Sequence, residues 1–353
     1  MILRDLLRVL GSSDRRDGRN LTHDEAFRAF GTILDGEESE IRIGAFLIAM
    51  RWKGTTVEEL TGFAKAARQR ARIPCEGMAG LCCLCPPHDG ADFDPPLEVA
   101  AGLVAAGAGA KILLISDRGV PPRRGVTAGD ALESLGAPLA WNTSDVEDTI
   151  ERTGFASIAA PVILPALLEL RRVRSEVGVR TPLSTVEKLI VPSTATVVTG
   201  AQHGPVLGIA VETISTLGHP NGIVIQGMGG GLTPNLKRRT RGIELSGNHQ
   251  VPLTVEPKDF GLACDENPEL PMYGPPDEGQ GTGDNPHLVQ AAGQITELAL
   301  KGESGPARNA TILSAAVILK AMRRAPTLAE GVDQAIKSID SGAAYAVLEN
   351  IRG

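Results

Sequence analysis

The sequence predicts an α/β protein in which a small all-helical N-terminal domain, residues 1–75, precedes a large α/β domain, residues 76–353. Two observations support this prediction. Up to about residue 72, apolar residues recur at helical spacing and the segments begin with helix-capping residues. From Gly80 onward, short apolar runs alternate with helical stretches, which is typical of a largely parallel sheet covered by helices.

The N-terminal helices are marked by capping residues. Thr22 with Glu25, and Thr56 with Glu59, match the capping box, in which the Thr hydroxyl accepts from a backbone N–H and the Glu reaches back. The stretch between them carries its apolar residues at helical spacing: Ile43, Phe46, Leu47 and Met50. This region is therefore predicted to be a helical bundle.

The second domain reads as strand–helix pairs. The expected strands are 81–85, 112–115, 197–198 and 222–226, and the expected helices are 97–108, 128–135, 209–217, 307–323 and 327–341. A third capping box, Thr327 to Glu330, begins the last of these helices. Residues 263–287 are rich in Pro, Gly, Asp and Glu, and are predicted to form a loop that is mobile or acts as a lid.

Composition narrows the class of function. The net charge is −7 over 353 residues, which argues against a surface built throughout for polyanions but allows a local basic patch. The N-terminus lacks a signal-peptide core, and the apolar stretch 97–115 is interrupted by Glu98 and Lys111. We therefore expect a cytoplasmic protein with no membrane contact.

The cysteines do not indicate a disulfide framework or a metal site. There are five, and four of them fall between Cys75 and Cys85. Cys82 and Cys83 are adjacent on an expected strand, so their side chains point to opposite faces and do not easily share one ion. We interpret them as small buried hydrophobic residues. The histidines His203, His219 and His249 follow no ligand spacing, and we expect them at the surface or in loops.

Two basic segments are candidate anion sites. Arg118, Arg123, Arg124 and Thr127 follow an expected strand, at the sheet edge where α/β proteins bind ligands. The run 237–241, which includes Lys237 and Arg238, could contact phosphates or could be a solvated surface turn.

Two further segments next to expected strands could either contact a ligand or form plain turns. The glycines Gly229 and Gly230 lie in a loop after a strand that could form a backbone anion nest or a flexible turn. His88 and Asp89 could be an acid and a base, although a polar ligand contact or a plain turn is favoured.

Several segments, taken in order, resemble the anthranilate phosphoribosyltransferase family. They are Leu21–Ala26, Gly44–Gly54, Thr153–Thr181, Lys258–Leu262, Gly305–Ala310 and Thr327–Gly331. The resemblance implies a large domain of the nucleoside phosphorylase/phosphoribosyltransferase type, with helices from about 163–190 packing on the helical domain. It also implies a homodimer.

The same alignment of motifs shows departures at the phosphate site. The family's Gly-Thr-Gly-Gly-Asp loop, whose N–H groups cradle pyrophosphate, corresponds to 86–90, where Pro86 and Pro87 have no N–H to donate. The family's Asn-x-Ser-Thr corresponds to 96–99, and its Lys-His-Gly-Asn-Arg run keeps only Arg118. The Asp-Glu pair that binds magnesium corresponds to Thr233 and Pro234, neither of which is a carboxylate.

These departures resemble a divergent, anthranilate phosphoribosyltransferase-like branch. Gly90 and Ala91 match its first loop, and Thr185, Lys188 and Pro192 match a later segment, whereas Asp92 stands where the branch often has Arg. The resemblance implies little anthranilate phosphoribosyl transfer and, in some members, nucleic-acid binding.

The functional expectation combines the resemblance with its departures. We expect a degenerate site for phosphoribosyl pyrophosphate and magnesium, with no cofactor unless transferase activity is retained. The predicted ligand bears phosphate, as a phosphorylated small molecule or single-stranded nucleic acid does. The predicted site residues are His88, Asp89, Gly90, Arg118, Arg123, Arg124, Thr127, Arg174, Lys188, Gly229, Gly230, Lys237 and Arg238. The alternatives are an active phosphoribosyl or glycosyl transferase with a rebuilt phosphate site, and an interaction protein that uses only the dimer scaffold.

Overall fold

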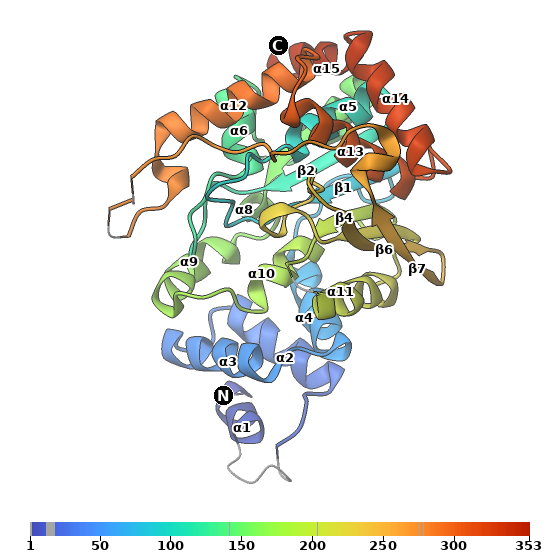
Figure 1. Ribbon diagram of the computed structural model, residues 1–353. Helices are drawn as coiled ribbons and strands as arrows, with labels where there is room; N and C mark the ends of the chain where they lie inside the picture. The colour runs from blue at the N-terminus through green and yellow to red at the C-terminus, as the bar shows by residue number, and fades with distance from the viewer. Residues whose placement is uncertain (1, 12–17, 141, 203, 275, 278) are drawn as a thin grey trace.

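The computed structural model describes residues 2–11, 18–140, 142–202, 204–274, 276–277 and 279–353. A small group of N-terminal helices lies against one side of a larger α/β unit, as expected (Figure 1). The N-terminal helices are α1 (Ile2–Leu10), α2 (His23–Leu34), α3 (Glu40–Lys53) and α4 (Val57–Arg70). The capping boxes predicted at Thr22 and Thr56 are both present, which confirms where α2 and α4 begin.

The sheet has seven strands in the order β3-β2-β1-β4-β5-β6-β7. Its first five strands are parallel, and β6 and β7 continue it as an antiparallel edge. The strands are β1 (Leu81–Cys85), β2 (Lys111–Ser116), β3 (Phe155–Ala159), β4 (Thr196–Gly200), β5 (Asn221–Ile225), β6 (Thr240–Ser246) and β7 (His249–Val255). The prediction of a largely parallel sheet is therefore confirmed.

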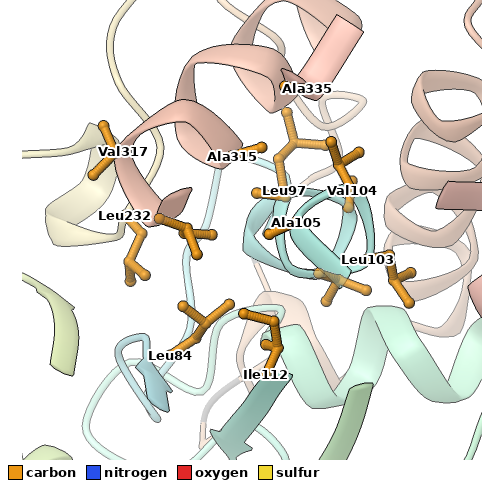
Figure 2. Close-up of a cluster of buried hydrophobic side chains, with 14 of the residues drawn as sticks. Leu84, Leu97, Leu103, Val104, Ala105, Ile112, Leu232, Ala315, Val317 and Ala335 are labelled. Carbon is orange, nitrogen blue, oxygen red and sulfur yellow. The ribbon is translucent and has the colours of Figure 1, made fainter. Parts of the chain in front are cut away.

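One face of the sheet is covered by the C-terminal helices and by α5 (Figure 1). The further helices of the chain are α5 (Glu98–Gly107), α6 (Ala128–Ser134), α7 (Val146–Thr153), α12 (Pro286–Leu300), α13 (Pro306–Ala321), α14 (Leu328–Asp340) and α15 (Ala343–Arg352). Figure 2 shows α5 between the sheet, represented by Leu84 and Ile112, and the C-terminal helices, with Val104 on the side toward Ala335 of α14. Burial of this aliphatic cluster is the main stabilising term for this layer.

The opposite face of the sheet shares its core with the N-terminal helices. The remaining helices, on this side, are α8 (Ala160–Ile163), α9 (Ala166–Val177), α10 (Leu183–Val186) and α11 (Gly204–Thr216). Helix α9 packs against α3, while α10 and α11 pack against α4. The helical group and the sheet are thus joined through one continuous apolar core.

Cys82 and Cys83 lie on opposite faces of β1, as predicted. Cys82 belongs to the core under α5, and Cys83 belongs to the core shared with the N-terminal helices. Both thiols are fully buried, and burial raises the pKa of Cys82 far above that of a free thiol. They pack as hydrophobic residues.

Several elements were not anticipated. Strands β6 and β7 were missed because β6 begins inside the basic run, and because β7 is a largely exposed edge strand containing Pro252. Residues 263–285 contain no α-helix or strand in their described part, in agreement with the loop prediction, but α12 begins at Pro286, inside the predicted loop. The lid role of this segment stays a prediction.

His219 lies in the loop between α11 and β5, as one of the expected alternatives, but it is not at the surface, and His203 lies outside the described residues. The side chain of His219 is buried between α4 and the sheet, where one ring nitrogen meets the Arg68 guanidinium and the other meets the Ala195 carbonyl. Burial lowers the pKa of His219 to about 4, so the ring is neutral near pH 7. Sequence reasoning missed this because Arg68 is 151 positions away. Among the helices that the structure describes, none has the length and apolar character needed to cross a membrane.

Candidate functional site

The candidate site lies at the carboxyl edge of the parallel strands, where β1, β2, β4 and β5 end next to the helical domain. The loops there follow from the strand order, because parallel strands present all their carboxyl ends at one edge. In Figure 1 this edge lies between the sheet and helices α9 and α10. It contains a closed turn, a basic loop, a cationic groove and an interdomain cavity.

The turn after β1 is packed shut. His88 and Asp89 are almost completely buried, at 1% and 2% exposure. Asp89 accepts two hydrogen bonds from the Arg180 guanidinium, at 2.6 and 2.7 Å, so its carboxylate is already paired. Gly90 has φ +68°, and a Cβ there would approach the Gly125 carbonyl oxygen to 2.3 Å. The turn therefore packs backbone to backbone on the next loop.

A buried polar cluster lies beside this turn. Arg174 and Glu187 form an ion pair, with side chains 5% and 3% exposed, and the Arg174 Nε donates to the Pro121 carbonyl at 2.7 Å. The His88 Nδ1 lies 3.7 Å from the Glu187 carboxylate. Neither ring nitrogen of His88 has a hydrogen-bond partner among the described residues.

The basic loop after β2 is held by contacts within the protein. Arg118 makes a two-bond ion pair with Glu133, at 2.8 and 2.9 Å. Arg123 donates to the Gly90 carbonyl at 2.9 Å, which fastens this loop to the turn after β1. The side chain of Arg123 also lies 3.5 Å from the Asp92 carboxylate. These positions give Arg118 and Arg123 structural roles, and their contact with a ligand stays a prediction.

Two more predicted residues of this loop have structural positions. Arg124 adopts a left-handed backbone conformation, with φ +54°, and its carbonyl accepts from the Gly283 N–H at 2.8 Å. The Thr127 hydroxyl caps α6 by accepting from the Asp130 N–H, and Asp130 reaches back to complete a capping box. That capping pattern was visible in the sequence, where Thr127 was instead interpreted as a ligand contact.

A buried carboxyl group lies where α5 begins, near the turn after β1. Burial, with a smaller contribution from the nearby Asp94 charge, raises the pKa of Glu98 to about 7. The space here, lined by Glu98, Asp94, Gly229 and Thr233 among others, is only about 20 Å³. That volume is on the order of a single water molecule.

The cationic groove follows the glycine-rich loop after β5. This loop turns sharply through Gly229 and Gly230, both with positive φ. The groove has a volume of about 770 Å³, and five cationic residues line it: Lys237, Arg238, Arg239, Arg241 and Lys258. All five are exposed, and no ion pair to any of them is found among the described residues. Asp94 and Glu256 are the acidic residues of its lining, so positive charge is in excess.

The interdomain cavity, about 420 Å³, lies on the other side of the glycine-rich loop. On the side of the helical domain it is lined by Arg51, Gly54, Thr55 and Leu60, and on the other side by residues that include Lys188, Gly200 and Val206 of α11. Lys188 donates to the Gly200 carbonyl at 2.8 Å, and burial lowers the pKa of Lys188. Sequence reasoning did not single out Arg51 and Arg180 as site residues, because their neighbours in this cavity are far away along the chain.

The predicted site residues thus lie in two places, except for Arg118. His88, Asp89, Gly90, Arg123, Arg124, Thr127, Arg174 and Lys188 surround the closed turn and the adjoining cavity. Gly229, Gly230, Lys237 and Arg238 line the groove. Arg118 points to Glu133 of α6.

Comparison with known proteins gives consistent results over nearly the whole chain. Residues 97–345 match the family model described as the glycosyl transferase family a/b domain, and residues 14–71 match the helical bundle domain of the glycosyl transferase family. The anthranilate phosphoribosyltransferase of Paracidovorax citrulli is 30% identical over 345 residues, covering 94% of this chain and 92% of its own length. The enzyme of the same name from Methylibium petroleiphilum is 31% identical over 333 residues, with 94% and 92% coverage.

Solved structures agree with this relationship. The anthranilate phosphoribosyltransferase of Thermus thermophilus superposes with a TM-score of 0.81 at 27% identity, covering 99% of this chain and 98% of its own. The Saccharomyces cerevisiae enzyme in complex with PRPP and Mg gives a TM-score of 0.80 at 19% identity, with 99% and 96% coverage, and at that identity supports the fold alone.

Proposed function

The chain belongs to the glycosyl transferase family that includes the anthranilate phosphoribosyltransferases, and within it we propose that this protein binds a phosphate-bearing ligand in its cationic groove. We further propose that it is not an efficient anthranilate phosphoribosyltransferase. Both proposals rest on one observation, which is that the exposed positive charge lies in the groove and not at the turn after β1. The turn that resembles the family's phosphate loop is closed, whereas five exposed cations line the groove beyond the glycine-rich loop.

The closed turn supports the proposal for steric and electrostatic reasons. A pyrophosphate cradle needs free backbone N–H groups and room for the backbone to approach the anion. Here Pro86 and Pro87 supply no N–H, and the Gly90 backbone is already packed on the neighbouring loop. Glu98 further places a carboxyl group at the start of α5, where the resemblance implies phosphate ligands. A diphosphate bound there would have to displace packed backbone and approach an acid.

The residues present do not fit the magnesium that the family resemblance implies. Magnesium prefers carboxylate and water oxygens in octahedral geometry. Thr233 and Pro234 stand where the resemblance implies an Asp-Glu pair. Within the described part of the chain there is no group of three or more His, Cys, Asp or Glu side chains arranged to hold an ion.

The anthranilate side of the site is changed as well. The resemblance places Arg174 on that side, where its guanidinium would be available to an acidic substrate. In this protein Glu187 already accepts hydrogen bonds from both terminal nitrogens of Arg174, and both side chains are almost completely buried. A substrate carboxylate would have to compete with this internal carboxylate, which supports weak recognition of anthranilate.

Direct binding tests the proposal. We expect a fluorescently labelled single-stranded oligonucleotide to bind, and the double variant Arg238→Gln/Arg239→Gln to bind it more weakly. The matched control Arg4→Gln/Arg8→Gln removes the same charge from exposed positions of α1 and should bind like the unaltered protein. Equal weakening by both double variants would show a general charge effect and would refute a groove site.

We also propose that the protein is a homodimer through the helical domain. Ile41, Ile48 and Trp52 are 85%, 40% and 92% exposed. Their spacing of seven and four residues places them on one face of α3. An exposed apolar stripe of this kind is typical of a surface that a protein partner covers.

A further inference from the structure

The cationic groove and the interdomain cavity adjoin each other. Gln202, in the loop after β4, and Gly230, in the loop after β5, line both of them. Arg180 lies at the junction, where its Nη1 is 3.4 Å from the Gln202 side-chain oxygen. A single ligand can therefore extend from the groove past this junction into the cavity.

The cavity differs from the groove in its chemistry. Leu60, Val206 and Ile209 provide apolar walls. Lys188 and Arg51 bring donors to the same space, and their hydrogen-bond partners among the described residues are the backbone carbonyls of Gly200 and Arg180. The volume of about 420 Å³ lies within the range of small-molecule pockets, roughly 300–1,000 Å³.

The acids that line the cavity are already compensated. Asp89 is paired with Arg180, and Glu187 is paired with Arg174. The cavity thus combines the donors of Lys188 and Arg51, which suit a group that accepts hydrogen bonds, with walls that favour an apolar surface. A flat heterocycle matches this combination, because its faces are apolar and its edge carries carbonyl oxygens and ring nitrogens.

We propose that the ligand is a nucleotide whose heterocyclic base occupies the interdomain cavity while its phosphates lie in the cationic groove. This inference rests on the proposed function, since it takes the groove as the phosphate site. It adds the class of ligand and the residues that recognise its organic part. Val206 and Ile209 flank the base, Lys188 and Arg51 donate to its edge, and the passage beside Gln202 holds the sugar.

Calorimetric titration with three probes tests the inference. Adenosine 5′-diphosphate and uridine 5′-diphosphate each carry a base, and inorganic pyrophosphate carries the same phosphates without one. We expect at least one nucleotide to bind about 10-fold or more tightly than pyrophosphate, a difference of about 1.4 kcal/mol. Val206→Trp, at a half-exposed position of the cavity wall, should reduce nucleotide affinity to that of pyrophosphate and leave pyrophosphate binding unchanged.

Control variants distinguish a failure of the nucleotide inference from a failure of the proposed function. Val251→Trp, on the exposed face of β7 and outside both spaces, should bind all three probes normally. Retained pyrophosphate binding shows that Val206→Trp is folded, and Lys188→Met offers a second cavity variant with the same expected loss. If pyrophosphate binds in the groove but neither nucleotide binds more tightly, or if both cavity variants keep the preference, the nucleotide inference is overturned. If pyrophosphate binding is absent or insensitive to Arg238→Gln, the proposed function itself fails.

Discussion

Removing two cations from the groove should change the salt dependence of oligonucleotide binding by an amount that the structure allows to be estimated. Each phosphate neutralised on a single strand contributes about −0.7 to the slope of log K against log salt concentration. The five cations of the groove set an upper limit of about −3.5 for that slope. Between about 50 and 200 mM salt, the affinity should then fall by roughly 100-fold.

The variant Arg238→Gln/Arg239→Gln leaves three cations in the groove, so the limiting slope becomes about −2.1 and the fall becomes roughly 20-fold. The assay is fluorescence anisotropy with a labelled oligothymidylate of about 12 nucleotides, titrated at several salt concentrations. The control Arg4→Gln/Arg8→Gln should keep the original slope. An unchanged slope in the groove variant would refute the assignment of these cations to phosphate contacts, even if the overall affinity had fallen.

Three further predictions concern stability and assembly. Burial raises the pKa of Glu98 to about 7, so the contribution of Glu98 to stability should decrease as pH rises from about 4.5 to 7. In urea unfolding, Glu98→Gln should therefore be more stable than the unaltered protein by up to about 3 kcal/mol above pH 7, but not near pH 4. An equal difference at both pH values would contradict this. Glu187→Gln should cost about 3–5 kcal/mol because it leaves the Arg174 charge buried without its partner, and a cost below about 1 kcal/mol would mean that the pair is solvated. Trp52→Glu should convert a dimer into a monomer in light scattering whereas Val251→Glu should not, and an unaltered protein that is already monomeric would exclude the dimer.

The fold could be predicted from the sequence because its signals are local. The capping boxes at Thr22, Thr56 and Thr327 depend on residues three positions apart, and all three are present. The alternation of apolar strands with helices likewise needs only a short window of sequence. Strand β7 was missed because an exposed edge strand has no continuous apolar run, and β6 was missed because it begins inside the basic run.

The site was less predictable because its chemistry depends on distant pairs. Asp89 is paired with Arg180, which is 91 positions away, and no pattern along the chain predicts that partner. Arg118 was expected to contact ligand because of its place after a strand, yet its guanidinium pairs with Glu133 of α6. Thr127 shows the opposite error, since its capping pattern was local and was interpreted as a ligand contact. The groove residues Lys237 and Arg238 could be predicted from charge alone, because they are adjacent in the sequence.

The most direct test of the central claim is isothermal titration of the protein with phosphoribosyl pyrophosphate and magnesium. If the turn at Pro86–Gly90 is closed to a diphosphate, adding magnesium should not strengthen binding, and any binding that remains should be weaker in Arg238→Gln/Arg239→Gln. Magnesium-dependent binding that is equally strong in this groove variant would contradict the account, because the donor would then be seated at the turn with its metal.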